Sequence, residues 1–138
     1  MVSQTVFFEN AESLRAFAAE FAIGLKAPRT VALTGGLGAG KTEFARAVIK
    51  RLAGADTVVP SPTFTLVQEY GMISHFDLYR IKSAAELEEI GFFDAVHKNI
   101  VLIEWPEIAE KFLPPDTIRI NIDIKDGGRE IKVSEREV

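Results

Sequence analysis

The sequence predicts an α/β fold in three layers, with a parallel centre to its sheet and antiparallel strands at its edges. Residues 29–34 and 99–104 are largely apolar and rich in β-branched side chains, which is typical of buried central strands. Segments with apolar side chains at helical spacing lie beside these runs. Residues 73–79 follow residues 64–70 too closely for a helical crossover, so this pair indicates an antiparallel hairpin.

Length and composition are those of an ordinary globular chain. The 138 residues predict a single domain over residues 1–138, with 47% hydrophobic and 26% charged residues. The net charge of −4 argues against a large surface for DNA or RNA phosphates. The absence of cysteine excludes disulfides, thiol catalysis and zinc–thiolate sites. No apolar run has the length of a membrane span and the first residues lack a signal pattern, so a cytoplasmic protein is expected.

The first elements are predicted to be a strand and a helix. Residues 3–8 have the composition of a strand, although their apolar side chains do not alternate cleanly. Asn10 is a favourable N-cap residue for the segment that follows. Apolar side chains recur at helical spacing over residues 11–26, and Pro28 is expected to end that helix.

A glycine-rich segment connects the strand at residues 29–34 to a helix that is expected to end near Gly54. It matches G-x-x-x-x-G-K-T, the pattern of a phosphate-binding P-loop, and so predicts a P-loop NTPase-like fold. Backbone N–H groups of such a loop converge on a phosphate, at the positive end of the following helix. We expect Lys41 to reach the β- and γ-phosphates and the Thr42 hydroxyl to bind Mg²⁺. The segment is Gly35-Gly36-Leu37-Gly38-Ala39-Gly40-Lys41-Thr42.

The rest of the chain is predicted to contain short elements. A capping box and a proline at a first helical position mark two short helices. Alternating isoleucines mark a half-solvated strand, and an Asp-Gly-Gly turn leads from it into a terminal hairpin. In order, the elements are a stiff connector at residues 56–63, in which Pro60 and Pro62 flank Ser61, a helix opened by residues 83–86, a helical turn at residues 92–97, a helix at residues 106–112, and strands at residues 118–124 and 129–133.

A P-loop requires an acidic side chain to complete the magnesium shell, usually after a neighbouring buried strand. Glu104 follows four apolar residues and so lies at the carboxyl end of a predicted strand, where ligands of α/β sheets bind. An ordinary surface acid at a strand end is the alternative. Asp77 is the second choice, because strand alternation places His75, Asp77 and Tyr79 on one face and their apolar neighbours on the other.

Other polar and aromatic residues carry weaker patterns. The serine and threonines of residues 61–65 lie where a nucleotide-sensing loop would run, but they are also ordinary loop residues. Trp105, the only tryptophan, is interpreted as a partly buried aromatic plug. His75 and His97 have no metal-ligand spacing and are interpreted as structural. Arg80 can compensate phosphate charge or form an ordinary salt bridge.

ATP is the expected nucleotide. The chain contains no N-K-x-D stretch of the kind that reads guanine, and Asp77 is not followed by the glycine of a GTPase switch. It also has no arginine-rich lid segment, which weakens a metabolite-kinase interpretation. A small P-loop kinase, or a nucleotide-dependent adaptor with little hydrolysis, remains the alternative to an ATPase.

Four motifs in this order and spacing closely resemble the TsaE family, also called YjeE, small bacterial ATPases of tRNA threonylcarbamoyladenosine synthesis. The resemblance covers nearly the whole chain. It implies an ATPase that works with TsaB and TsaD and resets or enables the TsaD–TsaB complex, while TsaD transfers the threonylcarbamoyl group to an adenosine beside the anticodon. No base-specific RNA binding of its own and no membrane contact are expected. Besides the P-loop, the motifs are residues 61–67 (SPTFTLV), 75–80 (HFDLYR) and 103–106 (IEWP).

The resemblance also implies roles for individual residues. Lys41, Asp77 and Glu104 would be catalytic, with Asp77 needed for hydrolysis. Thr42 and Glu104 would hold Mg²⁺, and residues 61–65 would act as a switch-like loop. The implied nucleotide-binding positions are Gly35, Gly38, Ala39, Gly40, Lys41 and Thr42, with Asn10 at the first helix and Arg129 in the terminal hairpin flanking the base.

Two positions depart from the family's usual loop, G-D-L-G-A-G-K-T-T. Gly36 replaces the acid and Glu43 replaces the second threonine. Neither change removes an implied phosphate or magnesium ligand, but Glu43 adds negative charge near the phosphates. Weak turnover by the isolated chain is expected, because no arginine finger is evident within it and the partners are expected to order the switch-like loop.

Overall fold

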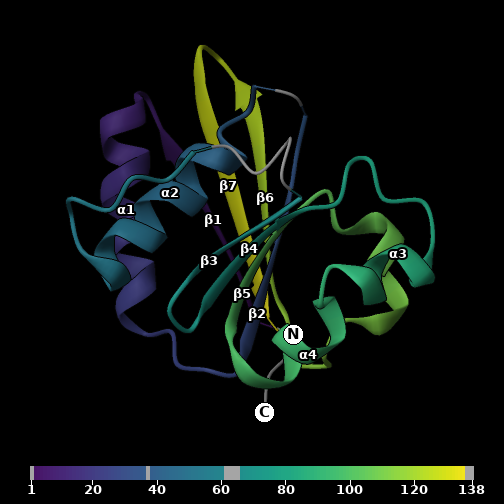
Figure 1. Ribbon diagram of the computed structural model, residues 1–138. Coiled ribbons are helices and arrows are strands. Elements are labelled where there is room, and N and C mark those ends of the chain that lie inside the picture. Colours follow the sequence, from purple (N-terminus) through teal and green to yellow (C-terminus); the bar gives the residue numbers. More distant parts are fainter. Residues whose placement is uncertain (1, 37, 61–65, 136–138) are drawn as a thin grey trace.

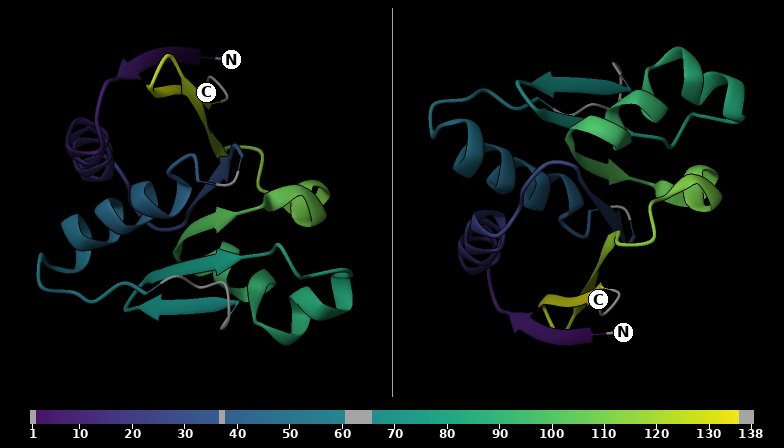
Figure 2. Two further views of the ribbon diagram at one scale, coloured as in Figure 1. Left: turned by 90° about the horizontal axis from the view of Figure 1, so that it is seen from above. Right: turned by 90° about the horizontal axis from the view of Figure 1, so that it is seen from below.

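The computed structural model describes residues 2–36, 38–60 and 66–135. Helices cover both faces of a central sheet (Figures 1 and 2). The strands are β1 (Val2–Phe8), β2 (Arg29–Thr34), β3 (Val67–Tyr70), β4 (Ile73–Asp77), β5 (Ile100–Glu104), β6 (Ile118–Lys125) and β7 (Gly128–Glu135). The helices are α1 (Ala11–Ile23), α2 (Lys41–Ala53), α3 (Ala84–Glu89), α4 (Phe92–Lys98) and the 3₁₀ helix η1 (Pro106–Phe112).

The sheet is parallel at its centre and antiparallel at both edges. Within the described residues its strand order is β1-β7-β6-β2-β5-β4-β3. β2 pairs in parallel with β5 and β6, and β5 pairs in parallel with β4. The outer pairs β3–β4, β6–β7 and β1–β7 are antiparallel. The predicted three-layer α/β fold is therefore confirmed.

Two apolar cores lie on opposite faces of the sheet. The helices α1 and α2 pack on one face, which curves around them, and α3, α4 and η1 pack on the other (Figure 2). Successive side chains of β5 point alternately into the two cores. Leu102 packs toward α2, whereas Val101 and Ile103 pack toward α4. Glu104 follows the same alternation as Leu102, so its side chain is directed to the face that α2 covers.

The first helix is shorter than the sequence predicts. It ends at Ile23 rather than at residue 26. At this end, the Gly24 N–H bonds the carbonyl oxygens of Phe21 and Ala22. Leu25 is still buried, although it lies outside the helix. The apolar pattern that extended the predicted helix therefore reports burial of Leu25 in the core rather than helical backbone.

The strands also differ from the prediction in places. β4 ends at Asp77 instead of residue 79. The Leu78 N–H still bonds the Glu104 carbonyl of β5, but the Tyr79 N–H bonds the Asp77 side chain. β3 begins at Val67; residues 64 and 65 of the predicted strand lie outside the described residues. In β6 the alternation of buried isoleucines stops before Ile124, which is 58% exposed.

None of the helices that the structure describes combines the length and the apolar character that crossing a membrane requires.

The core beside α2 should depend strongly on Phe44. Its side chain is fully buried, and its ring packs against Phe17 and Phe21 of α1 at centroid distances of 6.4 and 5.6 Å. Phe44→Ala should therefore lower the free energy of unfolding by about 3–5 kcal/mol, measured by urea denaturation. Phe7→Ala is the control, because the Phe7 side chain is 44% exposed. Equal losses for the two variants would contradict this description of the core.

Candidate functional site

The glycine-rich segment lies between the end of β2 and the start of α2. Three of its glycines have positive φ angles, 132° at Gly35, 74° at Gly38 and 113° at Gly40. At Gly35 a side chain is excluded outright, because a Cβ atom would clash with the backbone oxygen of Ile122. The segment therefore adopts a tight turn that leads directly into the positive end of α2.

Lys41, the first residue of α2, points back across this turn. Its side chain is 5% exposed, and Nζ donates a hydrogen bond to the Gly35 carbonyl oxygen at 2.6 Å. The same Nζ lies 3.4 Å from the ring centroid of Trp105, which in turn packs against Tyr79. Burial lowers the pKa of Lys41, and the nearby carboxylate of Glu104 opposes that shift.

The side chains of Thr42, Glu104 and His75 form a continuous hydrogen-bonded chain. The Thr42 hydroxyl donates to Oε1 of Glu104 at 2.7 Å. The other carboxylate oxygen, Oε2, lies 2.7 Å from Nε2 of His75. Glu104 is 3% exposed and His75 is fully buried. The end of β5 thus meets the first turn of α2 on one side and the middle of β4 on the other.

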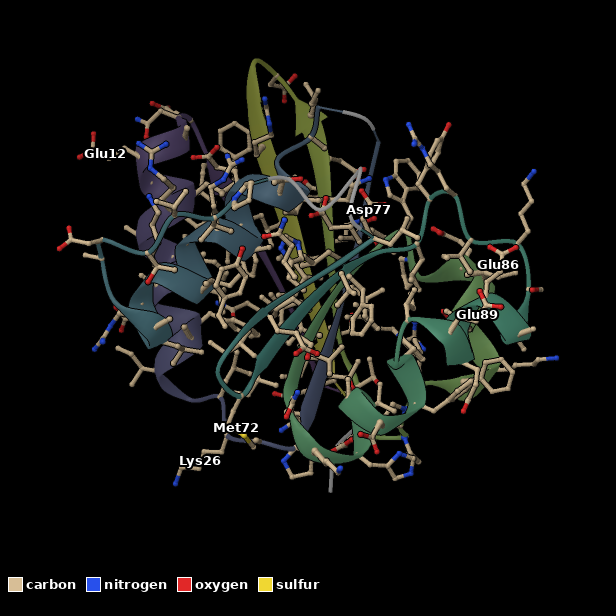
Figure 3. The ribbon with its side chains drawn as sticks, viewed as in Figure 1. Glu12, Lys26, Met72, Asp77, Glu86 and Glu89 are labelled. Carbon is tan, nitrogen blue, oxygen red and sulfur yellow. The ribbon has the colours of Figure 1, made fainter. Side chains whose placement is uncertain are left out.

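Asp77 lies beside Glu104 at the same end of the sheet. The two residues are register partners in the parallel pair β4–β5. Asp77 is 5% exposed, and its Oδ1 accepts a hydrogen bond from the Tyr79 N–H at 3.0 Å. Figure 3 shows Asp77 near the centre of the molecule, whereas Glu86 and Glu89 lie on the outlying α3. The sheet register therefore gathers two buried carboxylates next to the glycine-rich segment.

The oxygen atoms at this point suit a magnesium ion. Thr42 and Glu104 offer a hydroxyl and a carboxylate within hydrogen-bonding distance of each other, and both are hard ligands of the kind Mg²⁺ prefers. Among the described residues no cluster of three or more histidine, cysteine, aspartate or glutamate side chains could hold a metal alone.

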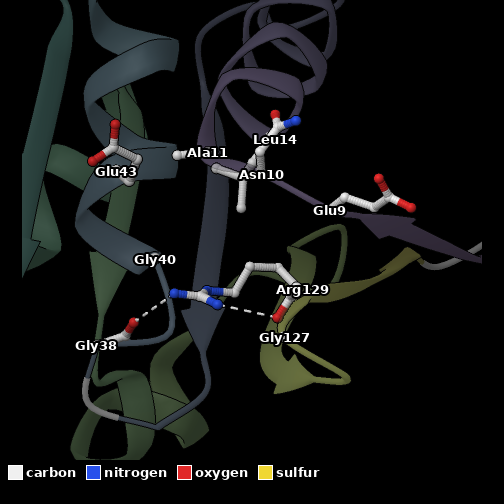
Figure 4. A pocket seen from close by; sticks show the side chains of 10 residues that line it. Glu9, Asn10, Ala11, Leu14, Gly38, Gly40, Glu43, Gly127 and Arg129 are labelled. Carbon is white, nitrogen blue, oxygen red and sulfur yellow. Dashed lines mark hydrogen bonds between the residues drawn. The ribbon is translucent and has the colours of Figure 1, made fainter.

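A cavity of about 300 Å³ opens on the other side of the glycine-rich segment (Figure 4). The start of α1 and the turn before β7 form its walls. Arg129 crosses toward the glycine-rich segment, where its Nε donates to the carbonyl oxygen of Ala39 at 2.9 Å. The lining residues are Glu9, Asn10, Ala11, Leu14, Gly38, Gly40, Glu43, Gly127, Gly128 and Arg129.

The two unusual positions of the segment have different surroundings. The Glu43 carboxylate accepts a hydrogen bond from Arg15 of α1 at 2.8 Å, which partly balances the negative charge it brings to the cavity. Among the described residues, no atom lies within 4 Å of a Cβ placed on Gly36. Replacing the usual acid by glycine therefore removes a side chain from an open position.

The structure brings together most of the site that the sequence predicts. Lys41, Thr42, Asp77 and Glu104 meet at the carboxyl ends of the central strands, and the Asn10–Arg129 cavity adjoins them. Two further residues complete this region. Trp105 contacts Lys41 as well as filling space, and the contact of His75 with Glu104 is absent from the sequence interpretation. The predicted switch-like loop, residues 61–65, lies outside the described residues.

The family model described as "Threonylcarbamoyl adenosine biosynthesis protein TsaE" matches residues 8–132. The chain belongs to the TsaE family. It is therefore a protein of tRNA threonylcarbamoyladenosine biosynthesis, and the family resemblance drawn from the sequence motifs is confirmed.

Individual TsaE proteins are similar over most of their length. TsaE of Rickettsia typhi is 45% identical over 119 residues, which cover 83% of both chains. TsaE of Bacillus subtilis is 35% identical over 134 residues, covering 94% of this chain and 79% of that one. The crystal structure of Bacillus subtilis YdiB superimposes with a TM-score of 0.79 at 27% identity, covering 97% of this chain and 86% of that one.

The tight turn at Gly35 gives a matched pair of variants. Gly35→Ala should destabilise the protein by at least about 2 kcal/mol, because a positive φ and a backbone clash both oppose the added methyl group. Gly36→Ala should change stability by no more than about 0.5 kcal/mol, because its Cβ position is open. Thermal unfolding followed by circular dichroism measures both. Similar stabilities of the two variants would refute the described turn.

Proposed function

We propose that this TsaE-family protein binds and hydrolyses ATP with Mg²⁺, as the ATPase subunit that works with TsaB and TsaD in threonylcarbamoyladenosine formation. The main support is the hydrogen bond between Thr42, at the start of a P-loop helix, and Glu104, at the end of the neighbouring parallel strand. These residue types at these two places are what a magnesium–nucleotide site requires.

The phosphates would bind at the P-loop. Its backbone and the positive end of α2 attract anions, and Gly35, Gly38 and Gly40 carry no side chain that would keep a phosphate from the backbone, with Ala39 between them. Lys41 is 5% exposed and its pKa is lowered by burial, so a bound phosphate would supply the charge partner that favours the ammonium form. We expect Lys41 to exchange its bond with the Gly35 carbonyl for bonds to phosphate oxygens.

Thr42 and Glu104 would hold the magnesium ion, Thr42 through its hydroxyl and Glu104 through its carboxylate. When bound, the ion neutralises charge that develops on the transferring phosphoryl group. Asp77, which adjoins Glu104 in the sheet, is the residue that we propose for orienting the attacking water. Asp77 and Glu104 are both buried, which limits their movement and favours a defined geometry.

The adenosine portion would occupy the cavity beside Asn10 and Arg129. Its volume of about 300 Å³ and its position next to Gly38 and Gly40 suit a group attached to phosphates in the P-loop. The Asn10 side chain is already engaged as the N-cap of α1, because its Oδ1 accepts a hydrogen bond from the Ser13 N–H at 2.8 Å. It would therefore act as a fixed part of the wall.

The ATP cycle would reset or enable the TsaD–TsaB complex between turnovers, with weak hydrolysis by the isolated chain and stimulation by these partners. We place this activity in the cytoplasm, where tRNA is modified and where a cysteine-free chain needs no oxidising environment.

Lys41→Ala should abolish partner-stimulated hydrolysis. Removing the P-loop ammonium takes away a positioned charge at the phosphates, so the rate of phosphate release from ATP in the presence of TsaB and TsaD should fall by about a hundredfold or more. Lys111→Ala is the control, because the Lys111 Nζ lies over Phe112 of η1, outside this site. Unchanged turnover by Lys41→Ala would show that the site is assigned wrongly.

Trp105 provides a direct signal for nucleotide binding. It is the only tryptophan, and Nζ of Lys41 lies 3.4 Å from its ring centroid. If Lys41 moves to the phosphates, the fluorescence of Trp105 should change on addition of Mg-ATP. The change should be absent in Lys41→Ala and present in Lys111→Ala. An unchanged wild-type spectrum at a nucleotide concentration that saturates binding by calorimetry would count against this movement of Lys41.

The same assays separate the two alternatives. Transfer of the γ-phosphate to an acceptor other than water would indicate a kinase. Tight ADP binding without stimulated turnover would indicate a nucleotide-dependent adaptor.

A further inference from the structure

His75 is a polar residue in the interior of the sheet. It lies in the middle of β4, between Ser74 and Phe76, and its side chain is fully buried. Nε2 lies 2.7 Å from Oε2 of Glu104, while Nδ1 has no hydrogen-bond partner among the described residues. An imidazole with one unsatisfied nitrogen is a costly way to fill an apolar space. The contact with Glu104 is therefore the feature of His75 that needs explanation.

The direction of this hydrogen bond is set by its partners. The Thr42 hydroxyl donates to Oε1 of Glu104, which is the arrangement of an accepting carboxylate. A carboxylate that serves as a magnesium ligand only accepts, so in the proposed site Nε2 of His75 carries the hydrogen and donates it to Oε2. In that tautomer the unpartnered Nδ1 carries no hydrogen. The unsatisfied group is then a lone pair and not a buried N–H group.

Together the two donors determine how the Glu104 carboxylate is rotated. The terminal torsion of a glutamate side chain is otherwise broad, because the carboxylate turns easily about its last bond. Here Thr42 of α2 holds one carboxylate oxygen, and His75 of β4 holds the other. A metal ion bound beside Thr42 would compete with the Thr42 hydrogen for Oε1 of Glu104, whereas Oε2 stays outside that competition. The bond from His75 is then the one of the two that can persist.

We infer that His75 is a positioning residue for Glu104: its Nε2–H fixes one carboxylate oxygen so that the other stays directed at the magnesium position beside Thr42. The inference rests on the proposed function, because it concerns the same magnesium–nucleotide site. His75 would touch neither the nucleotide nor the metal. Residues that orient a metal ligand in this way typically affect metal affinity by about ten- to a hundredfold when they are changed.

A second role must be distinguished from this one. His75 could serve only to fill the core beneath α2, in which case any well-tolerated replacement would leave magnesium binding unchanged. The structure offers two replacements that differ in the relevant hydrogen bond. His75→Gln can place an amide N–H where the imidazole Nε2 lies, and His75→Leu fills the space without a donor.

The test measures how much Mg²⁺ is needed for tight ADP binding by the full-length chain, using calorimetry at a series of Mg²⁺ concentrations. His75→Leu should raise the half-maximal Mg²⁺ concentration by about tenfold or more, whereas His75→Gln should stay within about threefold of the wild type. ADP binding in EDTA should be the same for all variants within about twofold, because phosphate contacts are unchanged. His97→Gln is the control, since that exposed imidazole bonds the Phe93 carbonyl in α4.

Three results would overturn the inference. His75→Leu with a wild-type Mg²⁺ requirement would show that the hydrogen bond is unimportant. Equal defects in His75→Gln and His75→Leu, or an equal loss of ADP binding in EDTA, would show a general structural role. Should His75→Leu fail to fold, His75→Asn replaces it, because its shorter side chain cannot place the amide at Oε2 of Glu104. A wild-type chain that binds ADP independently of Mg²⁺ would instead overturn the proposed function itself.

Discussion

The contact between Thr42 and Glu104 is the interaction on which the rest of the site depends. It joins the first turn of α2 to the carboxyl end of β5, two segments that are 62 residues apart in the chain. The contact exists because β2 and β5 are adjacent parallel strands that end at the same edge of the sheet, and because α2 starts immediately beyond β2. A shift of one residue in the pairing of these strands would turn the Glu104 side chain to the opposite face and remove the contact.

Burial determines the electrostatic character of this region. Lys41, Asp77 and Glu104 are each at most 5% exposed, so they bring two carboxylates and one amine into a small volume with little water. Desolvation lowers the pKa of the amine, while the carboxylates favour its charged form. Hydrogen bonds from Thr42 and His75 also stabilise Glu104. The remaining negative charge is of the kind that a divalent cation offsets, which agrees with the proposed magnesium site.

Much of this arrangement could be predicted from the sequence, because its parts are local. The glycine pattern, the strand before it and the helix after it predict a phosphate-binding loop. Glu104 is predicted as a magnesium ligand from its place at the end of an apolar run. The contact of His75 with Glu104 could not be predicted in this way, because it depends on the register that places Asp77 beside Glu104. The end of α1 was predicted wrongly because Leu25 is buried outside the helix. Apolar spacing reports which side chains are buried and does not by itself report backbone conformation.

The hydrogen bond from Arg129 to Ala39 joins two parts of the molecule that the strand order keeps apart. Arg129 belongs to β7, one strand in from the β1 edge of the sheet, whereas Ala39 lies in the segment that follows the central β2. The guanidinium therefore ties the glycine-rich segment to the terminal hairpin. A truncation that ends the chain before β7 would remove this hydrogen bond together with the strand. The terminal hairpin therefore contributes to the shape of the glycine-rich segment, although it lies outside that segment in the sequence.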